Sequence, residues 1–217
     1  VFLIIFFLGM STELFIRPGI IVSGDAAATV RNIAASEALF RLSLVSDLIR
    51  QALLMLLPLV LYKLLKPVNK NIASLMVIFA LVRVPIAMLN ELNHFAALLL
   101  SSGAGYLTAF KAGQLNALVM FFLELRKYGT FIPQLLSVWV VLLGYLVFKS
   151  GFLPRILGIL LMLGGLCYTV LAVLFFLFPN FDATIFGLFA FIGESVFYLW
   201  LLIKGVKDQK PASVEVG

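Results

Sequence analysis

Charged and polar side chains that could bind a ligand or transfer a proton lie within the apolar segments of this sequence. Between Ile72 and Leu100, Asn90 and His94 fall about 20° to either side of Arg83 on a helical wheel, and Glu91 falls about 80° away. An ionisable group inside hydrocarbon costs about 2.5 to 3.5 kcal/mol on insertion scales and usually faces a partner or a wet cavity. The spacing therefore predicts a polar stripe directed at a protein interior.

Two further apolar segments have a similar polar face. Ser43, Asp47 and Arg50 share an arc in one of them, and Glu194 and Tyr198 share an arc with Gly187 in another. The rise of a helix puts Arg50, Asp47, Arg83 and Glu194 near the middle of the membrane, with Glu13, Glu91 and His94 nearer the non-cytoplasmic side. We expect Arg83 to pair with Asp47 or Glu194. The candidate ligand-binding residues are Asp47, Arg50, Arg83, Asn90, Glu91, His94, Glu194 and Tyr198.

Two interpretations of these embedded charges stay open. The arginines and carboxylates could neutralise one another and fix the helix register, since buried pairs can serve specificity alone. They could instead line a cavity for a ligand or an ion. His94 is ambiguous in the same way, because its ordinary pKa of about 6.5 suits proton transfer, although a lone histidine is more often a packing residue.

The residue types exclude several chemistries. One His and one Cys do not make a zinc site of the usual kind, paired histidine ligation of haem is impossible, and no lysine lies mid-span to hold retinal. Serines such as Ser43, Ser46, Ser137 and Ser195 lack a second histidine or a Gly-x-Ser-x-Gly turn. We therefore predict no catalytic residues, no metal and no cofactor.

Composition places these residues in a membrane. The 217 residues are 63% hydrophobic and 12% charged, with a mean hydropathy of +1.15. A hydrocarbon core of roughly 30 Å needs about 20 apolar residues per helix, so the length suits six spans and no separate soluble domain. The net charge of +6 is explained by membrane orientation, which argues against nucleic-acid binding. Cys167 is alone, so no internal disulfide forms.

The apolar runs predict an all-α membrane protein, a bundle of about six transmembrane helices with two interfacial helices on the non-cytoplasmic side. The predicted spans are Val1–Ile16, Leu39–Leu65, Ile72–Leu100, Phe131–Phe148, Ile156–Phe178 and Thr184–Ile203. The first is short, and we expect residues before Val1. Arg17, Pro18 and Gly19 should end it.

The interfacial helices are predicted at Gly24–Glu37, capped by Ser23 or Asp25, and at the amphipathic segment Lys111–Lys127. Small-residue positions Gly158, Gly164 and Gly165 predict close helix contacts in the fifth span. Residues 1–204 would form one transmembrane domain, followed by a polar tail at 205–217.

The distribution of basic residues predicts how these spans are oriented in the membrane. Lysines and arginines gather on one side, as the positive-inside rule expects of the cytoplasm, so both termini of this multi-pass cell-membrane protein should be cytoplasmic. These residues are Lys63, Lys66, Lys70, Lys149, Arg155, Lys204, Lys207 and Lys210.

Three stretches resemble a known family. GDAAATVRNIAASEALFRL, LNHFAALLLSSGAGYLTAF and KSGFLPRILGILL occur in the order and spacing of a bacterial membrane family known as domain of unknown function 4386. The resemblance covers nearly the whole chain and implies a compact multi-span protein of the bacterial inner membrane. It implies no activity, ligand or catalytic residue.

The residues leave three function classes open. The first is a non-enzymatic bundle that binds or passes a small polar or amphipathic molecule in a polar cavity. The second is a structural or accessory subunit, whose partners are membrane lipid and other membrane subunits. The third is a lipid-modifying enzyme with Glu91 and His94 as acid and base, for which no nucleophile is evident.

The predicted orientation is testable by cysteine labelling in intact cells. Cys167 is first replaced, and a single cysteine is then introduced in place of Lys66 or of Asp182. Only the cysteine at position 182 should react with an impermeant reagent added outside the cells. Labelling at position 66 without labelling at 182 would invert the orientation.

Overall fold

The chain folds into helices that account for the six expected spans. The computed structural model describes residues 1–178 and 184–204, and this part contains no strand. Six of its helical stretches are long and apolar enough to cross a bilayer, which confirms the predicted class. They are Phe2–Ile20, Glu37–Leu65, Lys70–Leu100, Ala112–Lys149, Arg155–Leu177 and Ile185–Lys204. The predicted turn containing Asp182 and the polar tail 205–217 lie outside the described residues.

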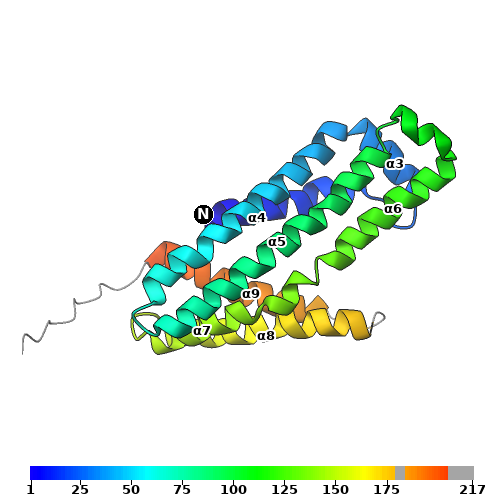
Figure 1. The fold of residues 1–217 in the computed structure, drawn as a ribbon. Coiled ribbons are helices and arrows are strands. Elements are labelled where there is room, and N and C mark those ends of the chain that lie inside the picture. Colours follow the sequence, from blue (N-terminus) through cyan, green and yellow to red (C-terminus); the bar gives the residue numbers. More distant parts are fainter. Residues whose placement is uncertain (179–183, 205–217) are drawn as a thin grey trace, which may run out of the picture. The chain divides into compact units, whose positions relative to one another are not determined.

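The chain divides into two compact units, and two long helices contribute to both (Figure 1). Unit 1 comprises Val1–Val60 and Ala80–Leu136, and unit 2 comprises Leu61–Phe79 and Ser137–Gly217. Helices α4 (Glu37–Leu65) and α5 (Lys70–Leu100) are long enough to span with tilt, and each continues through an internal proline. Their bounds lie close to the predicted second and third spans.

The first helix of unit 1 does not stop at Arg17. Helix α1 (Phe2–Met10) continues through a π-helical segment, η1 (Ser11–Ile16), into α2 (Arg17–Ile20). The Arg17 N–H donates to the Thr12 carbonyl, five residues back, as a π turn requires. Pro18 follows this turn near the start of α2, where a missing N–H is tolerated. The sequence prediction was therefore wrong here: Pro18 and Gly19 lie inside the helix.

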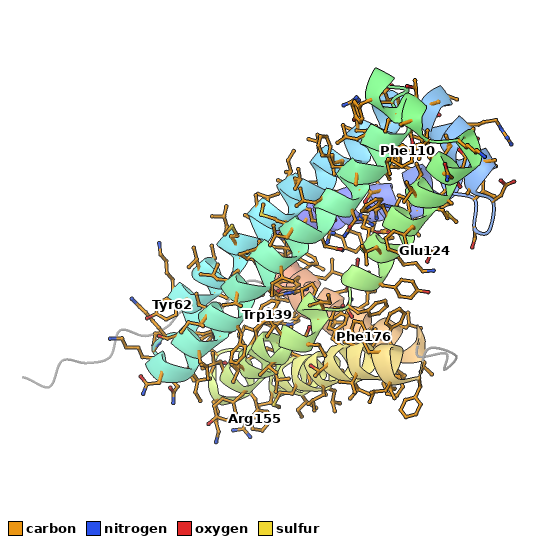
Figure 2. The ribbon with its side chains drawn as sticks, turned by 45° about the vertical axis from the view of Figure 1, so that its right-hand side comes forward. Tyr62, Phe110, Glu124, Trp139, Arg155 and Phe176 are labelled. Atoms are coloured by element: carbon orange, nitrogen blue, oxygen red, sulfur yellow. The ribbon has the colours of Figure 1, made fainter. Side chains whose placement is uncertain are left out.

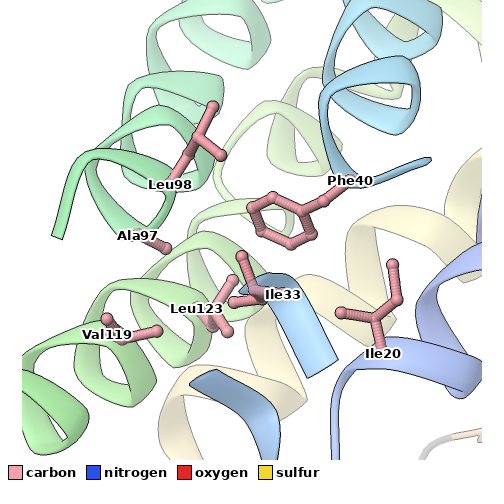
Figure 3. Close-up of a cluster of buried hydrophobic side chains, with 7 residues drawn as sticks. All are labelled: Ile20, Ile33, Phe40, Ala97, Leu98, Val119 and Leu123. Atoms are coloured by element: carbon pink, nitrogen blue, oxygen red, sulfur yellow. The ribbon is translucent and has the colours of Figure 1, made fainter. Parts of the chain in front are cut away.

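Helix α3 (Ala26–Ala35) begins at a side-chain cap and packs into a small apolar core. The Asp25 carboxylate accepts a hydrogen bond of 2.8 Å from the Ala28 N–H, which confirms one of the two predicted caps. Ile33 then meets side chains from four other helices, including α6 (Ala112–Gly129) (Figure 3). The buried members of this core cluster are Ile20, Ile33, Phe40, Ala97, Leu98, Val119 and Leu123.

The region of the predicted fourth span is built differently from the expectation. After the 3-10 turn η2 (Gly105–Ala109), α6 ends at Gly129, and a second 3-10 turn, η3 (Pro133–Leu136), precedes α7 (Val138–Lys149). Twelve residues of α7 rise only about 18 Å, too little to cross hydrocarbon alone. The candidate span therefore extends from Ala112 to Lys149 and includes α6. The surface position of Lys111–Lys127 stays a prediction.

Unit 2 is held together by close contacts between helix backbones. Helices α7 and α9 (Thr184–Lys204) both pack against α8 (Arg155–Leu177); Figure 2 labels Trp139 on α7 and Arg155 and Phe176 on α8. A Cβ added to Gly158 would lie 2.6 Å from the Gly144 carbonyl oxygen, and a Cβ at Gly165 would lie 2.8 Å from Val141. The predicted small-residue contacts of the fifth span are therefore confirmed.

Replacing Gly158 should loosen this packing. We expect Gly158→Ala to lower stability by about 1 to 3 kcal/mol, because the new methyl meets backbone that must move. Gly187→Ala is the matched control in α9, since its nearest neighbour is the end of the Leu171 side chain at 3.4 Å, and alanine favours a helix. Thermal unfolding in a mild detergent measures both, and equal stabilities for the two variants would contradict the packing account.

Candidate ligand-binding site

The Asp47 carboxylate is the central acceptor of a buried charge cluster in unit 1. Its side chain is 1% exposed, and Arg17 from α2 pairs with Oδ2. Arg126 from α6 donates through Nη2 to the same oxygen at 3.0 Å, and Arg50 reaches Oδ1 at 3.3 Å. One carboxylate on α4 is thus bound by guanidiniums from two other helices and its own.

Glu91 on α5 adds the second buried carboxylate. Arg126 donates to it in a two-point contact, from Nε to Oε2 and from Nη2 to Oε1, each at 3.0 Å. Such fork geometry is the strongest form of an arginine–carboxylate pair. Arg126 therefore joins α4, α5 and α6. We call Asp47, Glu91, Arg17, Arg50 and Arg126 the charge cluster.

Local sequence explains how these groups approach. Gly9 on α1 leaves room for Arg50, whose Cδ would lie 3.4 Å from a Cβ there. Gly129, at the end of α6, is covered by the Asn90 side chain, whose Cγ would lie 2.7 Å from a Cβ there. Asn90 also donates a 2.8 Å hydrogen bond to the Arg126 carbonyl. Small residues thus admit the long polar side chains between helices.

Glu13 pairs with the charge cluster but is much more exposed than the arginines of that cluster. The side chains of Arg17 and Arg126 are 8% and 12% exposed, whereas that of Glu13, which pairs with Arg17, is 58% exposed. The inner groups are therefore desolvated and held by several partners, while Glu13 pairs from the edge. Because water screens the Glu13 carboxylate, this pair should contribute less to stability than the buried pairs of Arg17 and Arg126.

His94 lies at the inner end of the cluster. Its Nδ1 is 3.5 Å from Glu91 Oε2, and its Nε2 is 3.4 Å from Ser43 Oγ. Its ring packs edge-on against Phe40, with centroids 4.3 Å apart. His94 is 1% exposed, and its Nδ1 has no hydrogen-bond partner among the described residues.

Serine, histidine and glutamate in this order resemble a nucleophile with its base, which the sequence did not reveal. Ser43 is fully buried, however, and its hydroxyl donates to the Phe40 carbonyl at 2.8 Å. It also lies inside α4, where the backbone N–H groups are already used by the helix and cannot stabilise an oxyanion. The row is better explained as buried polar groups packed beside the charge cluster than as a catalytic triad.

A pocket opens beside the cluster. Its volume is about 350 Å³, near the lower end of the range for small-molecule sites. The charged residues that line it are Glu13, Arg17, Glu124, Arg126 and Lys127. Ile21, Leu123 and Phe131 line it with apolar surface, and His94 and Thr130 complete the wall. Glu124, on α6, is labelled in Figure 2. The pocket therefore offers both charged and apolar side chains to an occupant.

The donor atoms of Asp47, Glu91 and His94 lie within 4.8 Å of one another, so distance alone would admit a metal ion. Charge disfavours it, because both carboxylates already accept arginine hydrogen bonds. Three buried or half-buried guanidiniums surround the two buried carboxylates, so a divalent cation would meet their repulsion at low dielectric and would have to displace arginine from each carboxylate. The site suits an anion better than a cation.

The structure brings together most of the predicted residues of the second and third spans. Asp47, Arg50, Glu91 and His94 meet in one cluster, and Asn90 supports Arg126. Arg83 is half-buried on α5, and its expected pairing stays a prediction. In unit 2, Tyr168 donates to Glu194 at 3.3 Å, and Tyr198 is buried. A ligand-binding role for any of these residues also stays a prediction.

Sequence analysis missed Arg17 and Arg126. Arg17 was interpreted as a helix end and Arg126 as the polar end of a surface helix, yet both enter the cluster. One pattern points to them: two embedded carboxylates on neighbouring spans need cations at their depth, and Glu13 stands four residues before Arg17.

This fold and site define a multi-pass helical membrane protein with a buried, paired charge cluster beside a pocket. The chain belongs to the family described as domain of unknown function 4386, whose model matches residues 1–205. An uncharacterised protein from Archaeoglobus fulgidus is 32% identical over 149 residues, which cover 68% of this chain and 74% of that protein. No solved structure matches the chain.

Removing one partner of a buried ion pair should lower stability more than removing both partners. We expect Arg126→Met to lower stability by about 3 to 5 kcal/mol, since it leaves Glu91 buried without its two-point contact. Adding Glu91→Leu should recover part of this loss. Thermal or denaturant unfolding in detergent measures the cycle.

A matched cycle at the exposed pair Glu37 and Arg41 should give a coupling below about 1 kcal/mol. Additive effects at Arg126 and Glu91 would show that the buried contact has no net coupling.

Proposed function

We propose that this protein is a non-enzymatic membrane protein that binds a small amphipathic molecule in the pocket of unit 1, either to hold it or to pass it along the bilayer. The observation that carries the proposal is the wall of this pocket. Arginine and lysine side chains line it together with the apolar side chains of Ile21, Leu123 and Phe131. A molecule with a polar head and a short apolar tail matches both kinds of side chain.

The buried cluster supports this proposal by giving the arginines of the wall a fixed position. Arg17 and Arg126 each contact Asp47, so their guanidiniums are held before any ligand arrives. Groups that are already ordered lose less side-chain entropy when a ligand binds. A cluster that only fixed helix register would not require two of its arginines to line a pocket.

Catalysis is less well supported by the same residues. His94 lines the pocket, but Ser43 is buried behind it and does not. The carboxylates are engaged by arginine, which leaves neither placed as a general base toward the pocket. Binding and release therefore account for more of the geometry than a reaction does.

A photoactivatable probe with an uncharged head tests binding at this pocket. An octanol analogue that carries a diazirine should crosslink to pocket residues in vesicles of phosphatidylcholine, as mapped by mass spectrometry. Thr130→Phe should reduce this labelling at least severalfold, because Thr130 is exposed at the pocket wall and a phenyl ring would fill part of about 350 Å³.

Thr108→Phe is the matched control. Thr108 is also exposed in unit 1, and each of the two hydroxyls donates to a nearby backbone carbonyl. Crosslinks spread over exposed apolar residues and unaffected by Thr130→Phe would reject the pocket as a binding site.

A further inference from the structure

We propose that the pocket selects amphipathic molecules with an anionic head, and that Glu13 is an internal carboxylate with which this head competes for Arg17. The inference rests on the proposed function, since it names the ligand class of the same pocket. It adds a specificity-determining pair, Arg17 and Glu13, to the site.

The charge balance of the cluster is the first argument. Arg17, Arg50 and Arg126 face the buried carboxylates of Asp47 and Glu91, so one positive charge is left over. Within the described contacts, Glu13 supplies the missing negative charge. An anionic head in the pocket, such as a carboxylate or a phosphate, would supply at least the same charge.

The geometry of Arg17 is the second argument. Its guanidinium uses Nη2 for Asp47 and Nη1 for Glu13, so the two contacts involve different ends of the fork. The Asp47 contact is buried, whereas Glu13 lines the pocket with a side chain that is 58% exposed. A ligand can therefore take the Nη1 contact while Arg17 stays anchored.

The backbone at Glu13 is the third argument. Glu13 lies in the π segment η1, a wider turn that often occurs at functional sites. Its carboxylate reaches Arg17 from the same helix, so it can leave without breaking a contact between helices. The buried pairs of Arg17 with Asp47 and of Arg126 with Glu91 would remain.

The neighbouring wall favours the same ligand class. Arg126 and Lys127 also line the pocket, and Lys127 forms an exposed pair of small net energy with Glu124 at 3.6 Å. A guanidinium N–H or a lysine ammonium donates equally to a carboxylate or a phosphate oxygen, so both head types fit. The apolar residues Ile21 and Leu123 then distinguish an amphiphile from a free anion.

A matched set of six-carbon probes tests this proposal in nanodiscs of phosphatidylcholine. Hexyl phosphate, hexylammonium, hexanol and inorganic phosphate are titrated into the full chain, and the affinities are measured by calorimetry. Hexyl phosphate should bind most tightly, inorganic phosphate more weakly, and hexylammonium least. Glu13→Gln should raise the affinity for hexyl phosphate about two- to fivefold, the value of an exposed ion pair that no longer competes.

Glu37→Gln is the matched control, because Glu37 forms an exposed pair with Arg41 at the same i,i+4 spacing and does not line the pocket. It should leave every affinity unchanged. Glu13→Asp, which keeps the charge on a shorter side chain, should bind hexyl phosphate with intermediate affinity.

The contrary outcomes separate the two proposals. An affinity for hexyl phosphate that Glu13→Gln leaves unchanged or lowers would overturn competition by Glu13. Equal, Thr130→Phe-sensitive binding of hexanol and hexyl phosphate would overturn anion selection and keep the proposed function. Inorganic phosphate binding as tightly as hexyl phosphate would replace the amphiphile with a free anion. No Thr130→Phe-sensitive binding of any probe would reject the proposed function itself.

Discussion

The desolvated carboxylate of Asp47 is the constraint on which the arrangement of unit 1 depends. A buried charge is tolerated only when partners replace the water it has lost. Asp47 obtains them from Arg17, Arg50 and Arg126, so α2, α4 and α6 must meet at one depth. Arg126 then extends the same requirement to α5 through Glu91. Apolar contacts alone discriminate poorly between helix positions in lipid, where the tails are as apolar as leucine. Ion pairs at one membrane depth fix which positions of neighbouring helices face one another.

The two units satisfy the demands of a membrane interior by different means. Unit 1 joins its helices through paired charges and a small apolar core around Ile33. Unit 2 relies on glycines such as Gly144 and Gly158, which let backbones approach until dispersion contacts replace lipid. Side chains that reach between helices need space, and those of unit 1 leave a pocket beside them. Close backbone packing is suited to rigidity, whereas the charged interior of unit 1 is suited to recognition.

Hydropathy predicted the second, third, fifth and sixth spans well, because each must place about 20 apolar residues in hydrocarbon, whatever its neighbours. The polar faces of the second and third spans were also predictable, since periodicity alone puts Asp47 on one side of its helix and Glu91 with His94 on another. The arginines that pair with these carboxylates from other helices were not predictable in this way. Arg17 and Arg126 lie near apparent helix ends, where arginine is ordinarily explained by water or headgroups. The π turn that carries the helix past Arg17, and the inclusion of α6 in the fourth candidate span, depend on tertiary contacts.

Under the proposed function the same arginines would serve structure and recognition, and their partners would divide these roles. Asp47 and Glu91 hold Arg17 and Arg126 from the buried side, where removal of a contact is costly. Glu13 holds Arg17 from the pocket side, where exchange with another anion costs little. A ligand that took the place of Glu13 would leave α4, α5 and α6 joined through Arg126 and would change only a contact within the first helix. Binding in this pocket would thus be compatible with an unchanged bundle, and any movement it caused would begin in the π segment.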